Sequence, residues 1–135
     1  MQIEKKCEQN MKDLAKEFKN CQKALVAIGD ETRQHIIITI LENDYCGMRV
    51  GDITKKTHLS RPAVSHHLQL LKEAGIINMH REGTKNYYYV DANETTWGQL
   101  TDLMNRINGI VKEVSDYKRK NGGAENLCEQ IFTNK

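Results

Sequence analysis

The 135-residue sequence has no long apolar run, and none of its stretches approaches the roughly 18 apolar residues that span a membrane. Its opening residues, MQIEKKCEQN, are polar and carry no secretory signal. We therefore expect a cytoplasmic protein with no membrane partner. With 39% hydrophobic and 28% charged residues, the length suits one globular domain with a modest core.

Signatures of catalysis are absent as well. The sequence contains no GxSxG, HExxH or P-loop motif and no paired catalytic carboxylates. The adjacent His66 and His67 do not replace them, because neighbouring residues on a helix point about 100° apart and cannot face one ligand well. The sequence therefore predicts a protein that is not an enzyme.

Cysteine is scarce and scattered. The four residues Cys7, Cys21, Cys46 and Cys128 include no CxxC pair, so we expect thiols rather than a disulfide framework in a cytosolic protein. Cys21 lies on the apolar seam of a predicted helix. We expect it to be a small buried side chain.

The most informative stretch is Ser60–Gly75, which reads SRPAVSHHLQLLKEAG. Ser60 is a favourable helix cap, Pro62 suits a first helical turn, and Gly75 can take the left-handed conformation that ends a helix. One face is apolar at roughly helical spacing, with Ala63, Val64, Leu68, Leu70 and Leu71. The opposite face carries the hydrogen-bond donors Arg61, Ser65, His66 and Gln69. Such a helix suits insertion into a DNA major groove.

Charge is distributed unevenly, although the formal net charge is only +2. Between Lys55 and Lys85 there are six basic residues against two acidic ones. Positive charge is thus concentrated around Ser60–Gly75, as attraction to DNA phosphates requires.

Two predicted helices and a turn precede this segment. Glu31–Glu42 is very apolar; with Asp30 as its cap, we expect a helix that is buried on most sides. Arg49–Thr57 is short, and His58–Ser60 makes a three-residue turn into the next helix. Helix, tight turn and helix form the supersecondary unit of many DNA-binding proteins.

A predicted β-hairpin follows. Ile76–Glu82 and Asn86–Val90 are rich in strand-forming residues and flank a glycine-containing loop at Gly83–Lys85. Its tip is basic, with Arg81 and Lys85. A hairpin in this position makes a wing that can reach the adjacent DNA backbone or minor groove.

Long helices are predicted on both sides of this region, at residues 4–28 and Asn93–Asp116. Their apolar stripes exceed what one small core needs, which indicates a partner subunit. The predicted interface residues are Leu14, Phe18, Leu25, Trp97, Leu100, Met104, Ile107 and Val111. We expect residues 1–120 to form one domain and residues 121–135 to be a polar tail, in which Leu127 and Ile131 could form a short helix.

Three stretches resemble the ArsR/SmtB family of bacterial winged helix-turn-helix repressors. They are ALVAIGDETRQHII, VGDITKKTHLSRPAVSHHLQLLKEAGII and REGTKNYYYV, which together cover roughly residues 24–90. The resemblance implies a mainly α fold with a β-hairpin wing. It also implies a homodimer that binds a pseudo-palindromic double-stranded DNA operator and is released by a ligand or a thiol reaction.

The resemblance also implies DNA-contacting positions. The matching residues are Ser60, Arg61, Pro62, Ser65, His66, Gln69, Arg81 and Lys85. Arg61 can bond bidentately to a guanine edge, whereas Lys55, Lys56 and Lys85 are expected to contact phosphates. Two alternatives stay open: Ser60 only caps its helix, or the chain is a protein-binding winged helix without DNA affinity.

The family's sensing motifs are not matched. Its CxCD motif aligns with Arg49–Asp52, which contains no thiol, and its Asp-x-His zinc site keeps only Asp91. Asn93, Met104 and Ile107 fill the other zinc-site positions, so we expect no tight family metal site. The releasing signal is therefore not identified by the sequence. The alternative is a soft metal ion, metalloid or oxidant acting at Cys46 with Cys7 or another cysteine.

Overall fold

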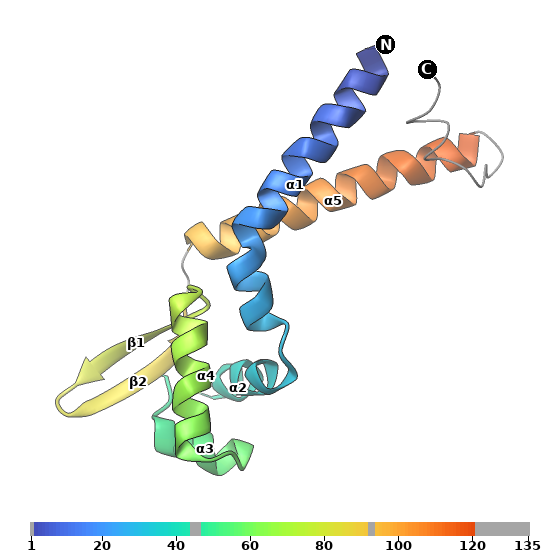
Figure 1. The fold of residues 1–135 in the computed structure, drawn as a ribbon. Coiled ribbons are helices and arrows are strands. Elements are labelled where there is room, and N and C mark those ends of the chain that lie inside the picture. The colour runs from blue at the N-terminus through green and yellow to red at the C-terminus, as the bar shows by residue number, and fades with distance from the viewer. Residues whose placement is uncertain (1, 44–46, 92–93, 121–135) are drawn as a thin grey trace. The chain divides into compact units, whose positions relative to one another are not determined.

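The computed structural model describes residues 2–43, 47–91 and 94–120 (Figure 1). The elements in chain order are α1 (Gln2–Ile28), α2 (Glu31–Leu41), α3 (Val50–Thr57), α4 (Arg61–Glu73), β1 (Ile77–Glu82), β2 (Lys85–Val90) and α5 (Glu94–Lys120). The fold class is the predicted one, mainly α with a two-stranded antiparallel hairpin. In the described residues, no helix is long and apolar enough to cross a membrane.

The chain divides into two compact units. One, which we call the winged unit, is Cys21–Gly98, and the other, the helical unit, joins residues 2–20 of α1 to residues 99–120 of α5. The prediction of a single domain over residues 1–120 stays a prediction. The predicted tail at residues 121–135 lies outside the described residues, as do Cys46, Asn93 and Cys128.

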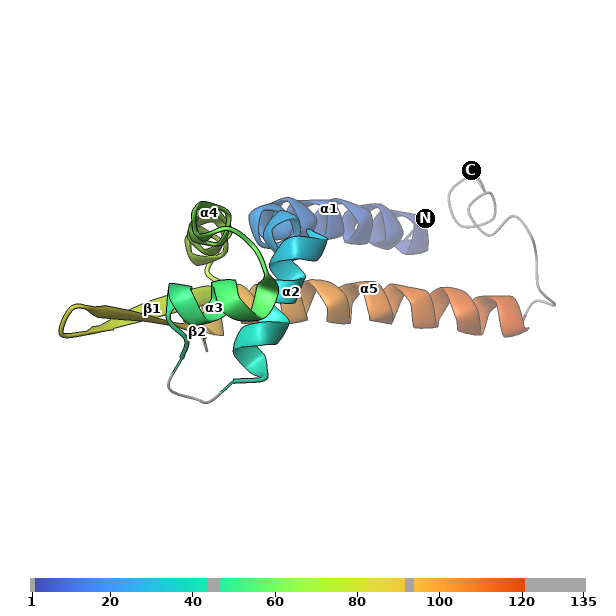
Figure 2. The ribbon, with the colours of Figure 1, turned by 90° about the horizontal axis from the view of Figure 1, so that it is seen from below.

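The core of the winged unit forms where α2, α3, α4 and the start of the hairpin meet. Its most buried side chains, each at most 1% exposed, are Ile36, Ile53, Val64, Leu68, Leu71, Ile76 and Ile77. These residues come from the apolar faces that the sequence pattern indicates. Figures 1 and 2 both show the hairpin projecting beyond the three helices.

Both ends of α4 are closed as predicted. The Ser60 hydroxyl accepts a hydrogen bond from the Ala63 backbone N–H at 3.3 Å. At the other end Gly75 has φ +77°, and the N–H of Ile76 bonds to the Leu71 carbonyl at 3.0 Å. This is a Schellman ending, in which a left-handed glycine lets the chain turn back on the last helical carbonyls.

Three predictions are wrong, two about where an element begins or ends and one about burial. Lys85 pairs with Glu82 inside the hairpin ladder instead of lying in the loop, so Gly83 and Thr84 form a two-residue turn. Gly83 supplies the positive φ of +62° that such a turn needs. α5 continues past the predicted Asp116 to Lys120, because its basic last turn is favoured at the negative end of the helix dipole.

The third difference concerns α2, which is less buried than predicted. Ile36, Thr39 and Ile40 face the core, whereas Ile38 is 50% exposed and Leu41 is 62% exposed. α3, α4 and β2 pack on α2, and they cover only part of its circumference. A run of isoleucines therefore does not by itself predict burial on every side.

Candidate nucleic-acid interface

The two faces of α4 have opposite environments. Val64, Leu68 and Leu71 are fully buried and fix the helix on the core. The other face is open: the six candidate residues on and just before α4 are all exposed, namely Ser60, Arg61, Pro62, Ser65, His66 and Gln69. The structure therefore presents a capped helix with its hydrogen-bonding face to solvent.

The turn before α4 has a specific backbone geometry. His58 ends α3 in the left-handed conformation, with φ +58°, and its N–H bonds to the Thr54 carbonyl at 2.9 Å. Lys55 and Lys56 are exposed in the last turn of α3. The two lysines and the exposed face of α4 thus lie on either side of one tight turn.

The hairpin is stiffened along one face by aromatic contacts. The His80 ring stacks on Tyr87 with centroids 5.3 Å apart and planes at 15°, and the Tyr89 ring lies 5.7 Å from the His80 ring at a tilt of 46°. His80 and Tyr87 are directly opposite in the ladder, where cross-strand pairs stabilise a sheet. Such packing lets two strands hold their shape beyond the helices.

The basic tip of the hairpin is exposed. Arg81 and Lys85 are both open to solvent, as a wing that touches DNA requires. Arg81 Nε donates to the Gly83 carbonyl at 3.0 Å, which holds the guanidinium beside the turn.

A short bridge outside the predicted elements anchors the hairpin. Met48 and Tyr88 exchange two backbone hydrogen bonds, of 2.8 and 2.7 Å, and Met48 is 2% exposed. Gly47 makes the approach possible, because it has φ +87° and a Cβ there would lie 2.9 Å from the Tyr88 carbonyl oxygen. The sequence predicts only a loop in this region.

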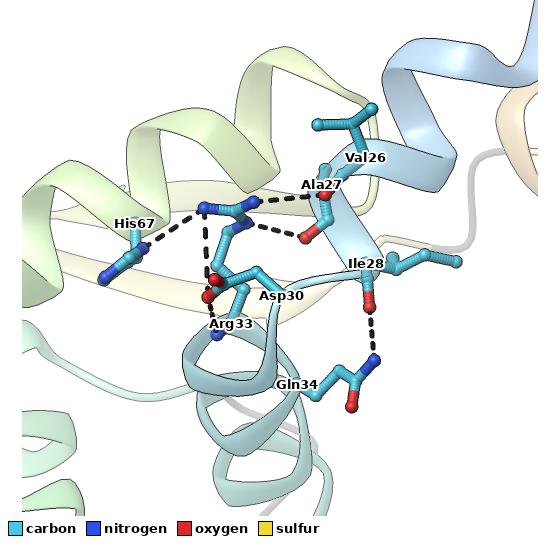
Figure 3. A network of polar contacts seen from close by, with 7 residues as sticks. All are labelled: Val26, Ala27, Ile28, Asp30, Arg33, Gln34 and His67. Atoms are coloured by element: carbon cyan, nitrogen blue, oxygen red, sulfur yellow. Dashed lines mark hydrogen bonds and ion pairs between the residues drawn. The ribbon is translucent and has the colours of Figure 1, made fainter.

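One arginine that the sequence reasoning missed joins three helices of the winged unit (Figure 3). Arg33 of α2 donates through Nε to the Ala27 carbonyl at 2.7 Å and through Nη2 to the Val26 carbonyl at 3.1 Å. Its Nη1 lies 3.5 Å from Nδ1 of His67, on α4. The side chain is only 13% exposed. Arg33 therefore ties the end of α1 to the helix that carries the candidate DNA contacts.

The cap of α2 belongs to the same network. Asp30 accepts a hydrogen bond from the Arg33 backbone N–H at 3.0 Å, and this bond lowers the pKa of the carboxyl below its ordinary value. Desolvation opposes this shift, and the charge of the Arg33 guanidinium, 3.9 Å away, acts in the same direction as the hydrogen bond, so that the pKa is lowered on balance. The prediction that Asp30 caps this helix is confirmed.

In the helical unit, an ion pair links α1 and α5. Arg106 Nη2 lies 2.7 Å from Glu17 Oε1, and this contact raises the pKa of Arg106. Glu17 Oε2 and Arg106 Nε are buried without a hydrogen-bond partner among the described residues. The pair thus makes one of the two bonds that a carboxylate and a guanidinium can share.

The predicted interface residues differ in exposure. Phe18, Met104 and Val111 of the helical unit are exposed by 50%, 50% and 56%. Leu100 is only 7% exposed, so it already packs within this chain. The others are partly buried: Leu14 and Ile107 in the helical unit, Leu25 and Trp97 in the winged unit.

Trp97 also has a structural bond, because its indole N–H donates to the Asp91 carbonyl at 2.6 Å. The carboxyl of Asp91 lies within 3.4 Å of the Asn78 amide. Both groups of Asp91 therefore have partners within the winged unit, although Asp91 is also the surviving position of the family's zinc motif.

The described residues give little support for a metal-binding or redox site built on cysteines. Cys21 is 3% exposed, which confirms its prediction as a small buried side chain, and Cys7 is partly exposed on α1. Cys46, the other candidate, lies outside the described residues. Within the part of the chain that the structure describes, no three His, Cys, Asp or Glu side chains are grouped to hold a metal ion.

Comparison with known proteins agrees with this geometry. Residues 30–79 match the family described as bacterial regulatory protein, arsR family. An uncharacterised HTH-type transcriptional regulator of Methanocaldococcus jannaschii is 43% identical over 65 residues, which span 47% of this chain and 70% of the relative. The transcriptional repressor SdpR of Bacillus subtilis is 42% identical over 62 residues, spanning 46% of this chain and 66% of SdpR.

Two further comparisons cover more of the chain. A homologue of the cadmium resistance regulator CadC from Staphylococcus aureus is 38% identical over 84 residues, spanning 62% of this chain and 61% of that protein. The solved structure of an ArsR-like transcriptional regulator from Rhodococcus superposes with a TM-score of 0.64 over 80% of this chain and 95% of its own. At 18% identity this last likeness shows the fold alone.

Proposed function

The chain belongs to the arsR family of bacterial regulatory proteins and is a DNA-binding transcriptional regulator, and we propose that it acts as a homodimeric repressor on a pseudo-palindromic operator. The observation that carries the proposal is the exposed hydrogen-bonding face of α4, which follows the exposed lysines of α3 along the chain and precedes the exposed basic tip of the hairpin. We also propose that the protein works in the cytoplasm, because that is where bacterial DNA lies.

Within this proposal the contacts fall into two kinds. Arg61, in the first turn of α4, reads a guanine edge, because a guanidinium can donate two parallel bonds to guanine O6 and N7. Lys55, Lys56 and Lys85 bind phosphates, which positions the helix without reading sequence. Ser60, Pro62, Ser65 and His66 line the groove around Arg61, and Arg81 reaches the backbone from the wing.

The partner subunit is a second copy of the chain. The exposed apolar side chains Phe18, Met104 and Val111 support this, because an isolated chain gains nothing by leaving them in water. A two-fold dimer presents two α4 helices to half-sites about one helical turn apart. Repression is supported by the likeness to SdpR, which is itself a transcriptional repressor.

The proposal is tested by selection from a pool of random DNA duplexes with purified protein. Wild type should enrich an inverted repeat, and Arg61→Ala should lose the enrichment while it stays dimeric. Lys19→Ala, an exposed cation on α1, is the matched control and should select the same sequence. Failure of the wild type to enrich any duplex would contradict the proposal, and transcription from a promoter carrying the selected site should fall when the protein is added.

The releasing signal is a separate part of the proposal. Relatives include a cadmium resistance regulator, which suggests a soft metal ion, metalloid or thiol reaction at Cys46 with Cys7 or another cysteine. A soft ion prefers three or more thiolates, which the CxCD position does not supply here. Operator binding with and without cadmium, arsenite, peroxide and persulfide, repeated for Cys46→Ser, tests this part: release that survives the substitution would contradict it.

A further inference from the structure

The exposed face of α4 has an acidic residue near its far end. Gln69 and Glu73 are four residues apart, one turn from each other on the same side of the helix, and Ser65 lies one turn earlier in the same row. All three are exposed. With Arg61 and Lys72, Gln69 and Glu73 face the side that the proposed function turns toward DNA.

The negative charge of Glu73 is unfavourable for DNA binding on such a face unless the carboxylate also contributes to the recognition of a particular base. A carboxylate beside phosphates weakens binding to every DNA sequence alike, because the charges repel. Glu73 is not neutralised by an ion pair with the neighbouring Lys72 in the described contacts. It instead accepts a hydrogen bond from Gln69 Nε2 at 2.9 Å.

This bond decides which way the Gln69 amide is turned. A carboxylate accepts but does not donate, so only the nitrogen end of the amide can face it. The carbonyl Oε1 and the second N–H of Nε2 then stay available to a ligand in the groove. Without Glu73 the amide can flip by a half turn and exchange its donor and acceptor ends.

We propose that Gln69 reads an adenine in each half-site and that Glu73 is the positioning residue that holds its amide for this base. Oε1 accepts from adenine N6–H and the second N–H donates to adenine N7, the bidentate pattern by which an amide recognises adenine. Guanine offers two acceptors, O6 and N7, so the fixed carbonyl meets O6 unfavourably. The inference rests on the proposed entry of α4 into the major groove.

Different turns of α4 would then read different bases. Its first turn, with Arg61, reads a guanine, and its third turn, with Gln69, reads an adenine. In this arrangement Glu73 provides discrimination between adenine and guanine, and its charge does not add to the affinity for DNA. Its removal should therefore change the ratio of two affinities rather than their average.

The test compares base preference in wild type, Gln69→Ala and Glu73→Gln by the same selection from random duplexes. Wild type should require adenine at one position of each half-site, and Gln69→Ala should accept any base there while keeping the rest of the site. Glu73→Gln should accept adenine and guanine nearly equally, because a glutamine at 73 can both accept and donate and no longer fixes the flip. Replacing that adenine by 7-deazaadenine should weaken wild-type binding roughly tenfold and leave Gln69→Ala unaffected.

Several results would overturn the inference. If Glu73→Gln binds all duplexes more tightly but keeps the wild-type preference for adenine over guanine, Glu73 acts only through its charge. A cytosine at the sensitive position would assign base reading to Glu73 itself, since a carboxylate accepts from cytosine N4. A selected site that is unchanged in Gln69→Ala would remove Gln69 from the interface while leaving the proposed function intact. Failure of the wild type to select any site would overturn both.

Discussion

At the scale of single residues, His58 is the clearest case of local strain. It is a non-glycine residue at φ +58°, where a Cβ crowds the backbone. His58→Gly should therefore stabilise the protein by about 0.5–1 kcal/mol, the relief of strain exceeding the added freedom of the unfolded chain. The midpoint of urea unfolding measures this change.

The control for His58→Gly is the reverse kind of change, in which a glycine with positive φ is replaced by a residue that has a Cβ. Gly75 has φ +77°, so Gly75→Ala should lower the stability by about 1–2 kcal/mol. If His58→Gly leaves the midpoint unchanged while Gly75→Ala lowers it, the turn before α4 is not strained.

Asp30 gives the protein a pH dependence whose sign follows from its lowered pKa. Because the folded carboxyl has a pKa below the ordinary value of 3.8, the folded state binds fewer protons than the unfolded chain near that pH. The contribution of Asp30 is therefore present above about pH 4 and is lost as the pH falls through the lowered pKa. Asp30→Asn keeps an oxygen that caps α2 but removes the titration.

Urea unfolding as a function of pH measures this difference. The loss of stability on acidification from neutral pH should be smaller for Asp30→Asn than for wild type. Glu31→Gln, the next residue and an exposed one, is the control and should follow the wild type. Parallel curves for wild type and Asp30→Asn would show that the cap does not depend on the charge.

At the scale of elements, Arg33 links the end of α1, the start of α2 and His67 of α4 (Figure 3). Arg33→Ala leaves two carbonyl oxygens without their charged donor, so we expect a loss of about 2–4 kcal/mol. Arg33→Lys should recover only part of it, because one ammonium group cannot serve both carbonyls and His67 in this geometry. Urea unfolding measures the loss, and the NMR signals of the His67 ring report the contact.

Arg61→Ala is the matched control, the same substitution at an exposed arginine of the winged unit. It should change the stability by no more than about 0.5 kcal/mol. Equal effects at the two positions would contradict the role of Arg33 as the link between the helices.

The features of these elements that the sequence predicts are local ones. The Ser60 and Asp30 caps, the Gly75 ending and the buried face formed by Val64, Leu68 and Leu71 each depend on residues within a few positions, so a periodic pattern and a capping residue are enough to find them. The exposure of the α4 candidates follows from the same pattern.

What the sequence does not predict depends on contacts between distant parts of the chain. Arg33 and His67 are 34 residues apart, and Met48 pairs with Tyr88 across 40 positions. No spacing within either segment indicates its partner. The exposure of Ile38 has the same origin, because it depends on which elements happen to cover α2. The Gln69–Glu73 bond is local, and its i, i+4 spacing could have indicated it.

At the scale of the whole molecule, the proposed dimer depends on the exposed apolar residues of the helical unit. Val111 is 56% exposed, so Val111→Lys should leave the chain folded but convert the dimer to a monomer at micromolar concentration. Sedimentation velocity measures the mass, and circular dichroism checks the fold. Leu100 is a poorer position for this test, because at 7% exposure a polar replacement would also damage the chain itself.

Asn105→Lys introduces the same charge on another exposed side of α5 and is the control. It should remain dimeric. A Val111→Lys protein that is still dimeric would exclude this surface of α5 as the interface.

The central claim, that the α3 lysines, the exposed face of α4 and the basic hairpin tip bind duplex DNA, is tested most directly by the salt dependence of operator binding. The logarithm of the affinity should fall linearly and steeply with the logarithm of salt concentration, since each phosphate contact releases bound cations. Lys85→Ala should flatten the slope by about 2, one contact from each subunit, and Lys19→Ala should leave it unchanged. An affinity that does not respond to salt, or a slope that Lys85→Ala leaves unaltered, would contradict the account.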